Sequence, residues 1–409
     1  MTGADLARRH VLLLQGPVGP FFAQLQRALE SQGARVTRVL FNAGDILFAP
    51  DHGTERFSGS RAAWVEWLET RIVEDRPDAI VLFGCKRPAH LVARDAAERH
   101  GIPLHSLEEG YLRSGFVTCE RGGNNNQSPI RGSLPAPGEK TEHPSAVSIA
   151  PNFRIMSWWG FLYYAARILF SRRDDEKLYH RSLGGPFREA AFWLRNAMRL
   201  VSTKRSEATA LRALYRDFDR DYFLVPLQMP SDSQMGAAAN GWSIERLIEG
   251  AIAGFAATRS KARLVFKLHP LDGEAGRRAR LIRDTARRHG VDDEVLVFHS
   301  GSMATMTQHS DGMIIVNSTS GFSALHHGVP LLVLGDAVFR NEALASCGDD
   351  ERAIERFMTE RFVAEEDLRR HYLEYLAAHA LVPGDFYDRN AMKVAAENVA
   401  QTVLDDCLN

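Results

Sequence analysis

Two adjacent carboxylates, Glu108 and Glu109, are the side chains of this chain best suited to reaction chemistry. They directly follow the apolar run 102–107, which predicts a strand, and they precede Arg113. We expect only one of the two to face a ligand, and a carboxyl group near a cleft has a raised pKa. Such a group serves as a general base or as a nucleophile at a sugar carbon, with Arg113 binding a substrate carboxylate. The alternative is a solvated acidic turn with Arg113 as a surface partner.

Basic and hydroxyl side chains end two later apolar runs and predict an anion site. Lys267 and His269 end the run 263–268, where their spacing places them on one face of a strand. They offer a cation and a titratable donor to a phosphate group. The run 313–317 is followed by three hydroxyl residues that open a helix, where backbone N–H groups also bind anions. A helix cap needs only one hydroxyl, so three favour phosphate binding. These residues are Ser318, Thr319 and Ser320.

Small and polar residues follow the first two apolar runs. Gly16, with Gly19, allows a backbone to come close to a ligand, or simply makes a tight turn. Asn42 and Asp45 could bind a polyol or make a turn of their own.

Composition excludes several classes of protein. Lys plus Arg number 50 against 51 Asp plus Glu, so the net charge of -1 argues against a nucleic-acid partner. The four cysteines lack the spacing of a disulfide framework or a zinc site. Asp217 and Asp219 match a D-x-D metal pattern but precede their strand, so no metal and no other cofactor is predicted.

The elements that must position these residues alternate between strand-length apolar runs and helical patterns, which predicts an α/β protein. The runs are mostly continuous, as in parallel strands covered on both faces. They lie at 10–15, 35–41, 78–83, 102–107, 222–228, 263–268, 294–299, 313–317 and 330–334. We predict two Rossmann-like domains that face a cleft and bind ligands at their carboxyl strand ends. The expected bounds are 1–150 and 215–409, with a helical insertion at 151–214 and a closing helix at 390–407.

The predicted insertion is basic and aromatic. From Arg154 to Arg205 it carries 11 Lys and Arg against 4 Asp and Glu, together with Trp158, Trp159 and Trp193. This composition favours the interface of an anionic membrane. The alternatives are a helical hairpin packed on the domains and a nucleic-acid surface. The apolar runs are too short for a signal peptide or a membrane span, so we expect a cytoplasmic protein, peripheral at the inner face of the cytoplasmic membrane.

Together these motifs resemble those of the bacterial capsule polysaccharide biosynthesis family, specifically its KpsS-like β-Kdo transferases. The resemblance covers most of the chain and rests on seven segments in order: 14–22, 41–45, 108–113, 124–128, 225–234, 267–270 and 318–321. It implies a GT-B-like fold, CMP-β-Kdo as donor and a phosphatidylglycerol-type lipid as acceptor. The β configuration would be retained, and the product would start the poly-Kdo linker of a capsule. Other capsule-assembly proteins are further expected partners.

The resemblance also implies roles for single residues. Glu109 falls on the acidic catalytic position beside Glu108, and His269 would stabilise the leaving phosphate. The expected donor-binding residues are Lys267, His269, Pro270, Ser318, Thr319, Ser320 and Gln228. The expected acceptor-side residues are Gly16, Asn42, Asp45, Arg113, Asn124 and Ser128. Three alternatives stay open: a related transferase for another CMP- or UDP-sugar, a nucleotide-sugar epimerase, and a non-catalytic scaffold of the capsule export complex.

Overall fold

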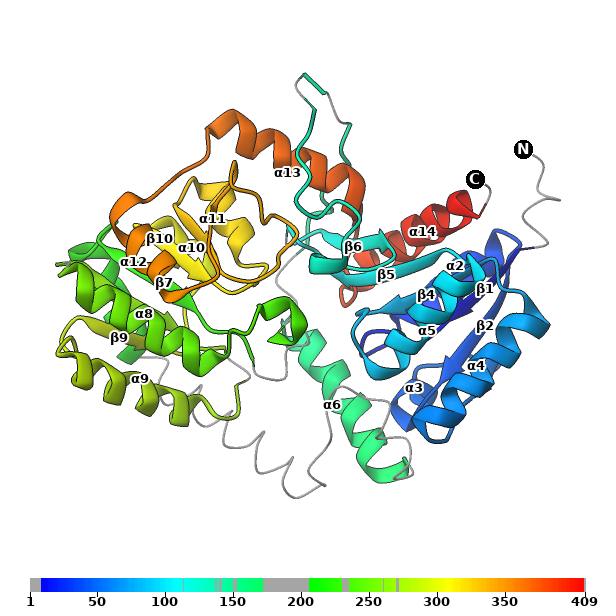
Figure 1. Ribbon diagram of the computed structural model, residues 1–409. Coiled ribbons are helices and arrows are strands. Elements are labelled where there is room, and N and C mark those ends of the chain that lie inside the picture. The colour runs from blue at the N-terminus through cyan, green and yellow to red at the C-terminus, as the bar shows by residue number, and fades with distance from the viewer. Residues whose placement is uncertain are drawn as a thin grey trace. The chain divides into compact units, whose positions relative to one another are not determined.

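The chain forms two compact α/β units, each built on one sheet (Figure 1). The computed structural model describes residues 9–112, 114–136, 138–139, 142–149, 153–171, 206–229, 235–259, 261–269 and 272–407. Unit 1 comprises Met1–Ile130, Gly138–Pro186 and Glu374–Asn409, and unit 2 comprises Arg131–Pro137 and Phe187–Leu373. All nine runs predicted as strands form strands, which confirms the α/β class.

Unit 1 contains a seven-stranded sheet in the order β13-β6-β5-β4-β1-β2-β3. Strands β1 to β5 run parallel, whereas β6 is antiparallel to both β5 and β13. The strand order reverses between β1 and β4, and ligands of open α/β sheets bind at the carboxyl ends of strands at such a switch point. The bounds are β1 (His10–Leu13), β2 (Arg35–Leu40), β3 (Thr54–Arg56), β4 (Ala79–Phe83), β5 (Leu104–Glu109), β6 (Phe116–Arg121) and β13 (Leu381–Pro383).

Helices cover both faces of this sheet. Consecutive strand residues point to opposite sides, so a continuous apolar run places apolar side chains on both faces. Val11 and Leu13 of β1 pack toward α2 (Phe21–Ser31) and α14 (Arg389–Asp406). Leu12 and Leu14 pack toward α4 (Arg61–Asp75) and α5 (Pro88–His100) on the other face. Every apolar residue of such a strand is therefore buried, which explains why the sequence shows continuous runs.

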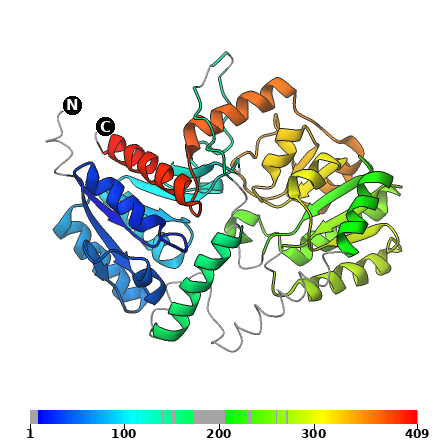
Figure 2. The same cartoon turned by 180° about the vertical axis from the view of Figure 1, so that it is seen from behind.

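Helix α14 lies beside α2 in unit 1 (Figure 2). The sequence analysis instead placed this closing helix in a second domain ending at residue 409. Its apolar stripe, which includes Ala395, Val399 and Val403, completes the unit 1 core, and β13 just before it adds a strand to the unit 1 sheet. The domain boundary therefore differs from the predicted one, since the chain returns to unit 1 after Leu373.

Helix α6 (Phe153–Phe170) also belongs to unit 1, where it packs against the short helix α3 (Ala43–Leu47). The sequence analysis assigned this segment to an insertion at 151–214, separate from both domains. Most of that insertion, residues 172–205, lies outside the described residues.

Unit 2 contains a six-stranded sheet in the order β12-β11-β10-β7-β8-β9, in which all neighbouring strands are parallel. Its order reverses between β7 and β10, so its switch point lies there. The strands are β7 (Tyr222–Pro226), β8 (Arg263–Lys267), β9 (Val295–Phe298), β10 (Gly312–Ile315), β11 (Leu331–Val333) and β12 (Ser346–Cys347). The helices are α8 (Ile244–Thr258), α9 (Ala275–His289), α10 (Met303–Gln308), α11 (Gly321–His327), α12 (Glu351–Glu360) and α13 (Glu366–Ala380), whose last turns pass into unit 1.

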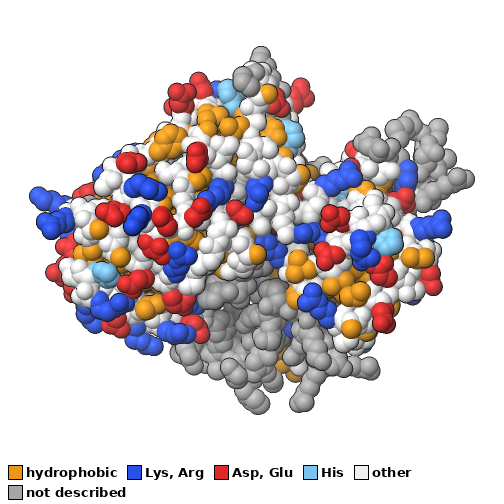
Figure 3. All heavy atoms as spheres, in the orientation of Figure 1, with side chains coloured by type: hydrophobic (Ala, Val, Ile, Leu, Met, Phe, Trp, Pro, Cys, Tyr) orange, Lys and Arg blue, Asp and Glu red, His pale blue; other side chains and the backbone are white. Residues whose placement is uncertain are grey.

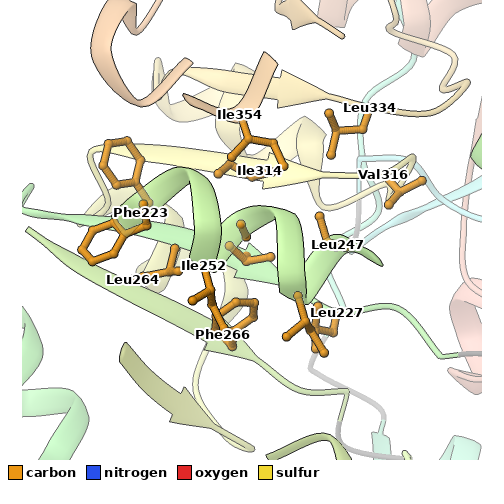
Figure 4. Packing of buried hydrophobic residues seen from close by; sticks show 14 of the residues in the cluster. Phe223, Leu227, Leu247, Ile252, Leu264, Phe266, Ile314, Val316, Leu334 and Ile354 are labelled. Carbon is orange, nitrogen blue, oxygen red and sulfur yellow. The ribbon is translucent and has the colours of Figure 1, made fainter. Parts of the chain in front are cut away.

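The core of unit 2 lies between its sheet and helices α8, α9 and α12. Figure 4 shows Phe223, Leu264 and Ile314 of the sheet in one cluster with Ile252 of α8 and Ile354 of α12. On the face of the molecule drawn in Figure 3, the described basic and acidic side chains are interspersed.

Candidate active site

The carboxyl edge of the unit 1 sheet at its switch point is formed by Gly16 and Arg87. Arg87 Nη1 donates to Gln15 Oε1 at 2.8 Å and to the Gly16 carbonyl at 3.1 Å. Gly16 lies so close to Phe22 that an added Cβ would be 2.5 Å from the ring. Packing therefore requires glycine here, and Gly16 lies in the turn after the first strand, where the sequence analysis expected it.

Strand β5 continues through Glu108 and Glu109, so both carboxylates belong to the strand and not to the turn after it. Neighbouring strand residues point to opposite faces, which separates the two side chains. Glu109 accepts a hydrogen bond from the buried Tyr387, and burial, followed by the charge of Glu109, raises the pKa of Tyr387 well above its ordinary value. Both carboxylates are half-buried. Arg113, their expected partner toward a substrate carboxylate, lies outside the described residues.

The most enclosed carboxyl group of this region belongs to Glu120 on β6, which the sequence analysis did not single out. Its side chain is 2% exposed. Oε2 accepts from Tyr111 Oη at 2.6 Å and from Asn124 Nδ2 at 3.3 Å, and Oε1 accepts from Ser128 Oγ. Burial raises the pKa of Glu120 to about 7, although these three hydrogen bonds oppose the shift. A buried carboxyl group therefore lies one strand away from Glu109.

Asn124 and Ser128, which were expected on the acceptor side, are both buried, and both donate hydrogen bonds to Glu120. Asn124 Nδ2 also donates to the Ser106 carbonyl at 3.0 Å, and Ser106 Oγ donates to Asn124 Oδ1. In this structure both side chains brace the β5–β6 hairpin that carries Glu109.

Asn42 and Asp45, also expected on the acceptor side, lie in a second buried network. Asn42 Oδ1 accepts from the backbone N–H groups of Gly44 and Asp45 and thereby caps α3. Tyr163 Oη of α6 donates to Asp45 Oδ1 at 2.9 Å and accepts from Asn42 Nδ2 at 3.0 Å and from Gln15 Nε2 at 3.1 Å. The two side chains are at most 3% exposed, so they hold α6 on α3 instead of facing a polyol.

In unit 2, four of the predicted donor-binding residues follow the two strands at the switch point of the sheet. Gln228 follows β7, and the three hydroxyl residues follow β10; parallel neighbours end at the same edge. Ser320 Oγ donates to Ser318 Oγ at 2.9 Å, and both side chains, like that of Thr319, are partly exposed. Asn317, just before them, is anchored by a 3.0 Å hydrogen bond from its Nδ2 to the Ala238 carbonyl. Partly exposed hydroxyls on an anchored strand end are suited to binding a phosphate.

Lys267 and His269 lie at the end of the neighbouring strand β8. The Lys267 ammonium is buried and donates to the carbonyls of Leu268 at 3.1 Å and His299 at 3.4 Å. Burial lowers the pKa of Lys267 to about 8, although the charge of Glu207 opposes the shift. Its ammonium thus holds the ends of β8 and β9 together. His269 is half-buried, and Pro270 lies outside the described residues.

Glu207, which the sequence analysis also did not single out, fixes the loop after β9. Its carboxylate accepts from the backbone N–H and Nδ1 of His299 and from the backbone N–H and hydroxyl of Ser300. Burial alone would raise its pKa, but these hydrogen bonds outweigh burial and lower the pKa of Glu207 to about 2. Among the described residues, no group of three or more His, Cys, Asp or Glu side chains is placed to hold a metal ion.

Two doubly wound sheets, each with polar side chains at its carboxyl strand ends, define an α/β protein with two Rossmann-like units. The chain belongs to the capsule polysaccharide biosynthesis protein family, whose model matches residues 78–387. It is 28% identical over 395 residues to the capsule polysaccharide export protein KpsS of Escherichia coli, covering 93% of this chain and 98% of that protein. The capsule polysaccharide modification protein LipB of Neisseria meningitidis serogroup B is 27% identical over 391 residues, covering 93% and 92%.

Solved structures with similar chains include the β-Kdo 2,4 transferase KpsC of Thermosulfurimonas dismutans, at 15% identity and a TM-score of 0.44. That match covers 95% of this chain and 97% of KpsC. The UDP complex of MnaA from S. aureus matches at 13% identity and a TM-score of 0.36, covering 97% and 95%. Within the parts of the chain that the structure describes, none of the helices has the length and apolar character needed to cross a bilayer.

Proposed function

We propose that the protein is a retaining glycosyltransferase. It moves β-Kdo from CMP-β-Kdo to a phosphatidylglycerol-type lipid and so starts the poly-Kdo linker of a capsular polysaccharide. Family membership supports a role in capsule synthesis. The observation that carries the proposal is the position of the Glu109 carboxylate at the end of strand β5, which is parallel to β4. The β5–β6 hairpin that carries it is held by the hydrogen bonds of Glu120 to Tyr111 and Asn124. The hydroxyl-rich strand end of unit 2 supports binding of a sugar nucleotide.

For the donor, Ser318, Thr319 and Ser320 bind the single phosphate of CMP through hydroxyl and backbone N–H groups. His269 stabilises the charge that develops on the leaving phosphate, and it can return a proton to it. Lys267 attracts the phosphate through its positive charge, which lies near the end of β8. Its N–H groups themselves bind the carbonyls of Leu268 and His299.

In the reaction, the Glu109 carboxylate attacks the anomeric carbon of the sugar. The bond from this carbon to the phosphate oxygen breaks, and CMP leaves with the electron pair. The acceptor hydroxyl then attacks the same carbon, loses its proton to a base and releases Glu109. Two inversions give net retention. If Glu109 is instead the base, no sugar–enzyme ester forms, and mass spectrometry of protein incubated with donor alone separates these two roles.

Helix α6 supports a lipid acceptor. Trp158 and Phe161 are 56% and 60% exposed, and Leu169 and Phe170 near its end are 68% and 73% exposed. Exposed aromatic and aliphatic side chains of this kind insert into the headgroup region of a membrane. We propose that this surface rests on the anionic inner face of the cytoplasmic membrane, where a lipid acceptor is available.

The decisive experiment combines purified protein with a CMP-Kdo generating system and a fluorescent phosphatidylglycerol, with mass spectrometry of the product. We expect one added Kdo with the wild-type chain and a loss of at least about 100-fold in turnover for Glu109→Gln. Glu98→Gln, on the exposed surface of α5, is the matched control and keeps wild-type turnover. Wild-type turnover in Glu109→Gln would remove this residue from the mechanism.

Two alternative activities predict other results in the same assay. A transferase for another sugar nucleotide would bind CMP or UDP and transfer only a different sugar. A nucleotide-sugar epimerase would convert its donor without any lipid. Absence of both CMP binding and Kdo transfer would overturn the proposal.

A further inference from the structure

The buried Glu120 has no place in the reaction proposed above, although it lies beside the strand that carries Glu109. We propose that Glu120 is a positioning residue, which fixes the Glu109 carboxylate through Tyr111. This inference rests on the proposed function, in which Glu109 reacts.

The register of the β5–β6 hairpin places Glu120 at its base and Glu109 near its end. Glu120 pairs with Ser106, whereas Glu109 pairs with Val117. Glu120 therefore lies on the hairpin face of Ser106, opposite to that of Glu109, and cannot touch the same ligand from its own position. Any effect of Glu120 on Glu109 must pass through another residue.

Tyr111 provides this connection. Only Gly110 separates it from Glu109, and its hydroxyl donates to Glu120 Oε2 at 2.6 Å and accepts from the backbone N–H of Asn125 at 2.5 Å. The short connection has little freedom, because an added Cβ on Gly110 would lie 2.4 Å from the Phe116 carbonyl oxygen. A shift of the Tyr111 ring would consequently be transmitted to the end of β5.

Neutral groups alone hold the Glu120 carboxyl group. Its hydrogen-bond partners are Tyr111, Asn124 and Ser128, and none of the ion pairs within the described residues includes it. Glu108 lies on the same face of β5 as Ser106, and its charge acts on Tyr111. The shape and the hydrogen bonds of the Glu120 side chain therefore hold the hairpin more than its charge does. We expect glutamine at position 120 to preserve the position of the hairpin.

The test compares Glu120→Ala, Glu120→Gln and Cys119→Ala in the full chain. Cys119 is buried on the same strand but faces the opposite side, so it controls for a general loss of packing. With Glu120→Ala we expect kcat to fall at least about tenfold, with the KM for CMP-Kdo within about twofold. We expect Glu120→Gln to keep kcat within about threefold and Cys119→Ala to keep it unchanged. A fall in kcat for Cys119→Ala equal to that for Glu120→Ala would overturn the proposal.

Hydrogen exchange separates failure of this inference from failure of the proposed function. In Glu120→Ala, amide exchange of the peptide spanning 106–116 should become faster, and Glu120→Gln should restore the wild-type rate. If the wild-type chain neither binds CMP nor transfers Kdo, but exchange follows this order, the hairpin role of Glu120 stands and the proposed function is wrong. Unchanged exchange in Glu120→Ala shows that Glu120 does not position β5, whatever the activity.

Discussion

At the scale of single residues, the surroundings of a carboxyl group decide what it can do. Glu120 and Glu207 have the same side chain, yet the pKa of Glu120 is raised to about 7 and that of Glu207 is lowered to about 2. Both are partly or fully buried. Burial raises the pKa of both groups, and it is more complete at Glu120, where it outweighs three hydrogen bonds from neutral side chains. At Glu207, four hydrogen bonds from His299 and Ser300, with the charge of His299, outweigh burial.

The raised pKa of Glu120 predicts a stability that depends on pH. Between its ordinary value of 4.5 and about 7, the folded chain keeps a proton that the unfolded chain releases. The free energy of unfolding therefore decreases as pH rises through this range, by on the order of 3 kcal/mol, and is level above it. Urea unfolding of unit 1 at pH 5 and pH 8 measures this decrease, which should be absent in Glu120→Gln. Parallel pH profiles of the two proteins would contradict the prediction.

The sequence predicted where some candidate residues lie in the fold and misjudged the surroundings of others. Ser318 and Gly16 were recognisable because they end strong apolar runs. Asn42 and Asp45 end such a run too, but Tyr163, far along the chain, covers them in the structure. Glu120 was missed because β6 alternates apolar and polar residues, and its charged side chain gave no sign of facing inward.

At the scale of elements, the Tyr163 hydroxyl adds three buried hydrogen bonds to the apolar packing that holds α6 on the rest of unit 1. Tyr163→Phe removes this hydroxyl and leaves Asp45, Asn42 and Gln15 each short of one partner in a buried network. We expect a loss of about 1–3 kcal/mol in the stability of unit 1 and faster amide exchange in α6. Hydrogen-exchange mass spectrometry with chemical denaturation measures both quantities.

Tyr375→Phe in α13 is the control for this substitution, with an expected change within about 0.5 kcal/mol. Equal effects of the two substitutions would show that the Tyr163 hydroxyl has no special role in attaching α6.

Prediction of strands succeeded for the continuous apolar runs and missed β6 and the three shortest strands. The central strands carry continuous apolar runs because helices cover both of their faces. The strands β3, β12 and β13 are two or three residues long and lie at sheet edges. These segments are strands because they pair with a neighbouring strand, and no local sequence pattern encodes that pairing.

At the scale of the whole molecule, the exposed apolar residues of α6 predict membrane binding. Wild-type protein should sediment with vesicles that contain anionic lipid at low salt, and Trp158→Ser with Phe161→Ser should lower the bound fraction several-fold. Phe362→Ser, which removes an exposed apolar side chain from unit 2, is the control and should bind like the wild type. Equal sedimentation of the α6 double variant and the wild type would contradict this prediction.

The two-domain plan was predictable from the alternation of runs and helices, but the path of the chain between the domains was not. The amphipathic sequence pattern of α14 indicates that this helix covers an apolar core. It does not indicate which of the two cores the helix covers. Its partner, α2, lies at the other end of the sequence, and Phe386 meets Phe21 at a ring-centroid distance of 4.7 Å.

The return of the chain to unit 1 has a consequence for biosynthesis. Residues up to Leu373 leave the ribosome before α14 is made, so unit 2 can close its core while one face of the first sheet is covered by α2 but still lacks α14. The half of the protein that is translated first is therefore completed last. During this interval the apolar surface beside α2 is a natural binding site for a chaperone on the nascent chain.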